Sequence, residues 1–106
     1  MNIKKYDLIF TPTAIKEINK IYNYISENLS AKNSAKRLMT KIEQKVQELK
    51  YSPQIYQVIE IDKKLKLNYR KIVINYYIVL YTINENKKTV YIAHVYYASS
   101  NYLNKI

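Results

Sequence analysis

The chain has 106 residues, of which 48% are hydrophobic and 25% charged, and it carries a formal net charge of +10. This length predicts one domain over residues 1–106, and the hydrophobic content excludes general disorder. No apolar run reaches the ~20 residues that a transmembrane helix needs, and no signal peptide precedes the first strand pattern, so we expect a cytoplasmic protein. The chain has no cysteine and one histidine. We therefore expect no disulfide, no metal site and no cofactor.

The excess of positive charge has two explanations, and the sequence leaves both open. A basic chain favours a polyanionic partner, either nucleic acid or an acidic protein. However, Ile, Lys, Asn and Tyr supply 56 of the 106 residues, and A/T-rich codons encode all four. Codon bias can therefore account for the overall charge, but it does not account for local clusters of cations.

A strand pattern over residues 4–10 is followed by a helix start. Apolar and polar side chains alternate along this strand. Thr11 is the expected N-cap, and Pro12 occupies the first helical position, where its missing N–H costs nothing. Apolar residues then recur every three to four positions from Ala14 to Leu29, which predicts an amphipathic helix.

A second amphipathic helix follows after a short break. Ser30 and Asn33 are both candidate N-caps, and an apolar stripe runs over residues 35–49. Cationic side chains occupy the opposite face of this helix. Pro53 disfavours helical geometry at the preceding residue, so we expect the helix to end just before it. The two helices form a helical hairpin whose apolar face needs a surface to cover.

The second half predicts three strands in a meander. Residues 65–74 alternate with a change of phase near Arg70, which suggests a bulge or the end of a loop. Residues 76–83 and 89–97 are rich in β-branched and aromatic side chains. The chain has no glycine, so asparagine, as at Asn75, is expected to supply positive φ in the turns. The order β-α-α-β-β-β predicts an α+β fold, with the helical hairpin on one face of a four-stranded, mainly antiparallel sheet.

This order of elements, with its side chains, resembles the RelE/ParE superfamily of toxins from type II toxin–antitoxin systems. The resemblance covers nearly the whole chain and rests on order and spacing, not on one strong motif. The matching positions are residues 9–14, 21–25, Leu29, Ala35, Ile42, Leu49, 52–53, 69–72, 75–81, 90–92 and 94–97. The resemblance implies a cytoplasmic growth-arrest toxin of the plasmid-stabilisation type, held inactive by a cognate antitoxin protein.

The resemblance implies one of two targets, and the sequence leaves the choice open. RelE-like members are mRNA interferases, which cut mRNA on the ribosome without a metal, whereas ParE-like members poison DNA gyrase. A weakened toxin that chiefly binds its antitoxin and regulates their operon is a third possibility. Only the first of these roles would make the chain an enzyme.

Metal-free RNA cleavage needs a group that activates the 2′-hydroxyl, cations that stabilise the transition state, and a proton source. The resemblance makes Arg70 a candidate phosphate-binding residue, and a surface arginine at a strand edge is the alternative interpretation. Relatives commonly read Tyr-Gly-Lys/Arg-Arg-Asp-Tyr after the last strand, where residues 97–102 read Tyr-Ala-Ser-Ser-Asn-Tyr. Ser100 thus replaces a RelE-like catalytic arginine, and Tyr77 stands where another arginine can occur. A serine offers no fixed charge to a phosphate.

His94 is the best remaining candidate for a general acid or base, because imidazole ordinarily titrates near neutral pH. Strand alternation is expected to place it on one face with Ile92 and Tyr96. A structural, hydrogen-bonded histidine is the alternative interpretation. Tyr97 and Tyr102 are candidates for stacking on a base or donating a proton, although in a chain with 13 tyrosines packing or codon bias is the more common explanation of each.

Five cations and no acid fall within the nine residues 63–71. Such a cluster is consistent with a phosphate-binding rim, which gives salt-dependent affinity and no sequence specificity. It is also consistent with the docking site of an acidic antitoxin, and the sequence does not separate the two. The cations are Lys63, Lys64, Lys66, Arg70 and Lys71.

Overall fold

The computed structural model describes residues 5–60 and 68–99 of the chain. Two helices and five strands form the framework, and shorter helical turns follow each helix. In chain order the elements are β1 (Asp7–Phe10), α1 (Pro12–Asn23), a π-helical turn (Tyr24–Asn28), α2 (Lys32–Gln47), two 3-10 turns (Glu48–Lys50 and Pro53–Ile55), β2 (Val58–Glu60), β3 (Asn68–Ile74), β4 (Tyr77–Asn84) and β5 (Thr89–Tyr97).

The strands form one five-stranded sheet in the order β1-β5-β4-β3-β2. Strands β2 to β5 pair antiparallel, and β1 lies parallel to β5 at the other edge. The predicted α+β architecture is confirmed, but the predicted number of four strands is wrong. The additional strand, β2, has three residues. A segment this short is too brief to show a clear alternating pattern in the sequence.

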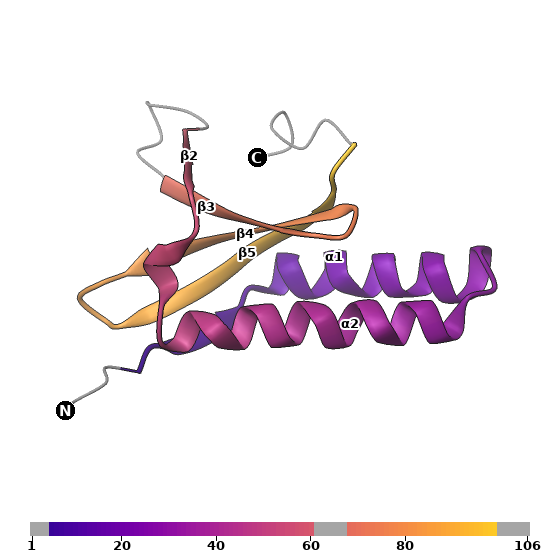
Figure 1. Ribbon diagram of the computed structural model, residues 1–106, viewed down its shortest axis with the longest axis horizontal. Coiled ribbons are helices and arrows are strands. Elements are labelled where there is room, and N and C mark those ends of the chain that lie inside the picture. Colours follow the sequence, from indigo (N-terminus) through magenta and orange to yellow (C-terminus); the bar gives the residue numbers. More distant parts are fainter. Residues whose placement is uncertain (1–4, 61–67, 100–106) are drawn as a thin grey trace.

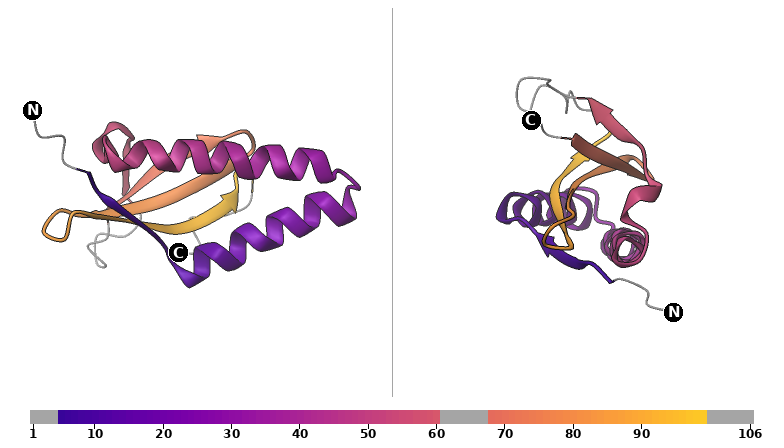
Figure 2. Two further views of the ribbon diagram at one scale, coloured as in Figure 1. Left: turned by 90° about the horizontal axis from the view of Figure 1, so that it is seen from below. Right: turned by 90° about the vertical axis from the view of Figure 1, so that its left-hand side faces the viewer.

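The helical hairpin covers one face of the sheet, and no described helix covers the other (Figures 1 and 2). The apolar stripe of α2 packs against the central strands and contributes most of the helical part of the core. Each fully buried Leu, Ile or Val contributes about 1.5–3 kcal/mol relative to an exposed side chain. Buried residues of this core include Leu38, Ile42, Val46, Leu49, Ile72, Val79, Tyr81, Val90 and Ile92.

The two helices begin differently. Thr11 is the N-cap of α1 as predicted, and its hydroxyl accepts a hydrogen bond from the Ala14 N–H at 3.1 Å. The predicted cap of α2 is wrong, because Ala31 is its N-cap and no side chain caps it. Ser30 adopts a φ of 49° instead, so it turns the chain between the helices.

A bulge near Arg70, one of the two explanations for the change of phase in residues 65–74, is not found in β3. Strand β3 pairs with β4 in continuous register, whereas the register of β4 with β5 shifts between Leu80 and Tyr81. Leu80 lies opposite His94 and Tyr81 lies opposite Ile92, so Ala93 is the extra residue. The change of phase in the sequence has another cause: β3 buries Tyr69 on one face of the sheet and Ile72 on the other.

Two residues, Asn75 and Tyr76, connect β3 to β4. Asn75 has a φ of 53°, so the prediction that asparagine supplies positive φ is confirmed at this turn. Lys88, before β5, also has positive φ, at 49°. Asparagine is therefore not the only residue that replaces glycine in the turns of this chain.

Candidate functional site

The face of the sheet opposite the helices carries a second group of buried side chains. We call this side the open face. Its buried members are Tyr69 from β3, Ile78 and Leu80 from β4, and Tyr96 from β5. His94 adjoins this group, since its ring lies 6.0 Å from that of Tyr69 and 5.0 Å from that of Tyr96. A titratable side chain therefore lies beside an aromatic cluster.

The bulge in β5 is held by the start of α1. The Thr11 N–H donates to the Ile92 carbonyl at 3.0 Å, and the Thr11 hydroxyl donates to the Ala93 carbonyl at 3.1 Å. The same hydroxyl caps α1, so one residue fixes both the bulge and the origin of the helix. Strand β1 pairs with β5 only as far as Ile92, and α1 runs beside the remainder of β5.

Glu17 of α1 occupies the edge of β5 that β1 leaves unpaired. Its carboxylate accepts a hydrogen bond from the Val95 N–H at 3.1 Å and lies 3.3 Å from Nδ1 of His94. The side chains of His94 and Glu17 are only 18% and 20% exposed. Glu17 thus satisfies a strand-edge amide and fixes the orientation of the histidine ring.

The Nδ1 atom of His94 is engaged on two sides. It lies 2.9 Å from the Tyr96 hydroxyl as well as near Glu17, and the Tyr96 ring stacks on the imidazole with an interplanar angle of 17°. When Nδ1 carries a proton it donates to the carboxylate, and when it does not it accepts from the tyrosine. In the described part of the chain only Nδ1 of this ring is engaged, so Nε2 is the ring nitrogen that a substrate could contact.

Burial and the neighbouring Glu17 carboxylate raise the pKa of Tyr96 to about 12. Tyr96 therefore stays protonated at neutral pH and is a weak acid there. Its hydroxyl orients His94 and is poorly suited to supply a proton in a reaction.

Lys71 is the described cation from the 63–71 cluster that shares the open face with His94. Lys71 pairs with Leu80 on β4, and Leu80 pairs with His94 on β5, so the three residues form one row across the sheet. Two strand spacings separate Lys71 from His94, which is about 10 Å.

Arg70 lies on the opposite, helix-facing side. It pairs with Tyr81, a member of the core beneath the helices. Its guanidinium donates to the Tyr56 carbonyl at 2.6 Å and to the Gln54 carbonyl at 3.0 Å. The Tyr81 hydroxyl donates to the Pro53 carbonyl at 2.6 Å. Arg70 and Tyr81 together hold the segment between α2 and β2 against the sheet.

The other candidate residues are not brought together with His94. Tyr97 follows Tyr96 and points to the helix side, where its ring lies 5.6 Å from that of Tyr77. Tyr102 lies outside the described residues, as do Ser100 and the cations Lys63, Lys64 and Lys66. The structure therefore separates Arg70 and Tyr97 from His94 by the thickness of the sheet.

Sequence reasoning missed Glu17 and misplaced Ile92. The expected shared face of His94 and Ile92 is wrong, because the bulge moves Ile92 into the core under the helices while His94 contacts Tyr96. Glu17 gave no signal, since an acidic side chain beside an apolar helical stripe is common on surfaces. Only the parallel placement of β1, which ends before β5 does, brings α1 to this strand edge.

No helix among the described residues is both long enough and apolar enough to cross a bilayer. Within the same part of the chain, no group of three or more His, Cys, Asp or Glu side chains is arranged to hold a metal ion.

Comparison with known proteins identifies relatives of this fold. Residues 8–102 match the family model described as ParE toxin of the type II toxin–antitoxin system parDE. A search of curated protein sequences found no match. Among solved structures, the chain is similar to one described as the chromosomal ParDE TA system from P. aeruginosa. That pair has 13% identity and a TM-score of 0.70, covering 91% of this chain and 99% of the other.

Two RelE-type structures are also similar. A mutant of the E. coli toxin RelE in the free state has 20% identity and a TM-score of 0.63, covering 95% of this chain and 92% of that one. The toxin–antitoxin complex RelBE2 from Mycobacterium tuberculosis has 20% identity and a TM-score of 0.62, covering 93% and 98%. At these identities the structural likeness shows a shared fold.

Proposed function

Because the chain belongs to the ParE toxin family of type II toxin–antitoxin systems, we propose that it arrests growth by poisoning DNA gyrase in the cytoplasm. We further propose that a cognate antitoxin neutralises it. Structural relatives that are toxin–antitoxin complexes support the antitoxin partner. Lys71, with Lys63, Lys64 and Lys66, is a proposed contact for an acidic segment of that antitoxin.

The positions of the arginines are our reason for proposing gyrase, and not mRNA, as the target. The chain has two arginines, Arg37 and Arg70. Arg37 is on α2, and Arg70 donates to two main-chain carbonyls on the helix side of the sheet. Neither guanidinium is therefore available on the open face to stabilise the charge of a phosphate in a transition state. This arrangement supports a binding toxin over an RNA-cleaving one.

Induction of the chain alone in a bacterial host tests the proposal. We expect growth arrest with intact mRNA and an accumulation of DNA breaks covalently linked to gyrase. Co-expression of the gene that neighbours the toxin, expected to encode a short protein with an acidic segment, should restore growth. Arrest with degraded mRNA and no DNA breaks would contradict the choice of target. No arrest at all would support the role of a weakened toxin that binds its antitoxin.

RNA cleavage remains a second candidate because of the His94 site. A histidine oriented by a carboxylate, with aromatic rings beside it and Lys71 in the same row, is suited to move a proton at a bound nucleotide. Under this alternative, His94→Gln should abolish cleavage while antitoxin affinity stays unchanged. Equal cleavage by the variant would remove His94 from the mechanism. Tyr97 and Tyr102 would then be the next residues to substitute.

A further inference from the structure

The far end of the helical hairpin extends past the β3–β4 turn, as two perpendicular views agree (Figures 1 and 2). The strands therefore do not cover the whole sheet-facing side of the hairpin. Two residues at this end show the consequence, since Tyr24 is 53% exposed and Leu29 is 56% exposed. The β3–β4 turn stands beside this uncovered end, with a hollow on each side of it.

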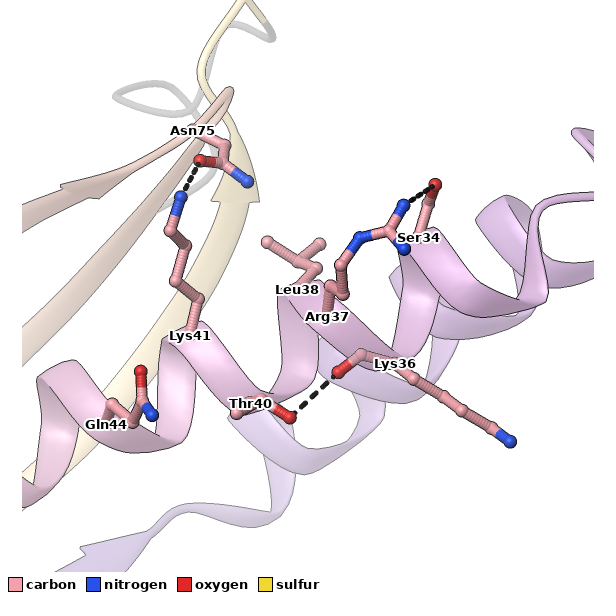
Figure 3. Close-up of a pocket in the computed structure, with 8 residues that line it drawn as sticks. All are labelled: Ser34, Lys36, Arg37, Leu38, Thr40, Lys41, Gln44 and Asn75. Atoms are coloured by element: carbon pink, nitrogen blue, oxygen red, sulfur yellow. Dashed lines mark hydrogen bonds between the residues drawn. The ribbon is translucent and has the colours of Figure 1, made fainter.

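The hollow on the α2 side is cationic (Figure 3). Lys41 donates to the Asn75 side-chain oxygen at 3.0 Å, and Arg37 donates to the Ser34 hydroxyl at 3.1 Å. Lys36 also lines the hollow, but its amine points away from the turn. No acidic side chain is among the described residues that line this hollow. Among the described residues, Arg37 and Lys41 thus have neutral hydrogen-bond partners and no acidic ion-pair partner.

The hollow on the α1 side is aromatic. Tyr24, Tyr76 and Tyr97 line it and are each at least half exposed, and Tyr76 in the turn is 74% exposed. Lys20 adds a cation at its rim, and again no described lining residue is acidic. The exposed apolar surface here therefore consists mainly of tyrosine rings, with a smaller aliphatic part. A tyrosine ring offers a flat face for stacking.

The two hollows meet at the turn, because Asn75 lines one and Tyr76 lines the other. We propose that together they form a binding surface for single-stranded nucleic acid. The backbone phosphates would contact Arg37 and Lys41, and unpaired bases would stack on the tyrosines around Tyr76. This surface is separate from the His94 site on the open face, and it does not depend on which target the toxin acts on.

The exposed tyrosines favour a nucleic-acid strand over an acidic protein segment. The cations do not discriminate, because a planar guanidinium such as that of Arg37 matches a phosphate or a carboxylate, and cations attract either kind of polyanion. Exposed tyrosine faces stack on any base, which is how sequence-tolerant single-strand binders obtain affinity. Paired bases in a duplex do not offer their faces, so a duplex should use the cations alone.

Fluorescence anisotropy with a labelled oligothymidylate tests the stacking part of the proposal. An oligonucleotide of about 12 nucleotides suits the ~4–16 nucleotides that single-strand binding domains occupy. We expect the double variant Tyr24→Ala/Tyr76→Ala to bind about tenfold more weakly, and Tyr76→Phe to bind as the wild type does. Tyr51→Ala is the matched control, because Tyr51 is 57% exposed and lines neither hollow. Melting curves of each variant report whether it folds.

The cationic part is tested by the dependence of affinity on salt. Each phosphate contact contributes about −0.7 to the slope of log K against log salt for a single strand. Arg37→Gln/Lys41→Gln should therefore make the slope shallower by about 1.4. Lys16→Gln/Lys45→Gln removes the same charge from exposed helical positions that line neither hollow, and it should leave the slope unchanged.

Several outcomes would overturn the proposal. Equal affinity for a duplex of the same length, with no effect of the tyrosine substitutions, would mean that the binding is nonspecific and electrostatic. Equal losses in the test and control variants would remove the surface from the interaction. Tighter binding of a polyglutamate peptide, lost in the same tyrosine variants, would assign the surface to a protein partner. None of these outcomes bears on growth arrest or gyrase cleavage, so the proposed function is tested separately.

Discussion

Substitution of Arg70 separates a structural role from a phosphate-binding role. In the structure the guanidinium donates to the Tyr56 carbonyl at 2.6 Å and to the Gln54 carbonyl at 3.0 Å. Hydrogen bonds to charged groups contribute about 1.5–3 kcal/mol, and two that share one side chain are not additive. We therefore expect Arg70→Ala to lower the free energy of unfolding by about 2–3 kcal/mol. Since 1 kcal/mol shifts the Tm of a domain of ~100 residues by about 4 °C, the expected loss is about 8–12 °C.

Thermal melting and urea unfolding measure this loss of stability. The variant Arg70→Lys tests whether the guanidinium itself, and not only the positive charge, is required. A lysine ammonium lacks the planar fork of arginine, so it should recover only part of the stability. Toxicity, scored at a temperature where both variants are folded, should persist. The reasoning would be refuted if Arg70→Ala melted as the wild type does while toxicity disappeared. Such a result would return Arg70 to the role of a phosphate contact.

Three further predictions concern single contacts. Glu17→Ala should lower the free energy of unfolding by about 1–3 kcal/mol and speed hydrogen exchange at the Val95 amide. Glu17→Gln keeps an acceptor and should recover most of this loss. Equal exchange rates at Val95 in the two variants would count against the contact. Asn75→Ala should be about 1 kcal/mol less stable than Asn75→Gly, because a left-handed φ of 53° penalises a β-carbon, and equal stabilities would refute that cause. Burial raises the pKa of Tyr81 from 10.0 to about 12. The protonated hydroxyl therefore makes its whole contribution to the free energy of unfolding below pH 10, and this contribution is lost as the pH rises from 10 to 12. Between pH 10 and pH 12, the free energy of unfolding measured in urea should fall less steeply in Tyr81→Phe than in the wild type, by about 1.4 kcal/mol per pH unit. Equal slopes in the two proteins would contradict a raised pKa for Tyr81.

The architecture could be predicted from the sequence because its elements carry periodic patterns. The stripe of α2 recurs at helical spacing, and the strands β4 and β5 are rich in β-branched and aromatic residues. The cap at Thr11 and the turn at Asn75 follow from local backbone chemistry, which a sequence records directly. Strand β2 could not be predicted in this way, since three residues make no period.

The arrangement of the site depended on contacts that no local pattern encodes. Alternation assigns a face only while the register is continuous, and the extra residue Ala93 breaks that register beside His94. The hydrogen-bond partners of the Arg70 guanidinium are two main-chain carbonyls in the segment before β2, and an irregular segment leaves no periodic signal. Glu17 reaches the edge of β5 only because α1 starts where β1 stops pairing.

Cleavage of plasmid DNA by purified gyrase tests the central claim most directly. The purified chain is incubated with gyrase, ATP and closed-circular plasmid, and the products are resolved after detergent and protease treatment. The account predicts linear DNA that requires gyrase and disappears when the antitoxin is added. Plasmid that stays intact, together with cleavage of ribosome-bound mRNA by the same preparation, would contradict it.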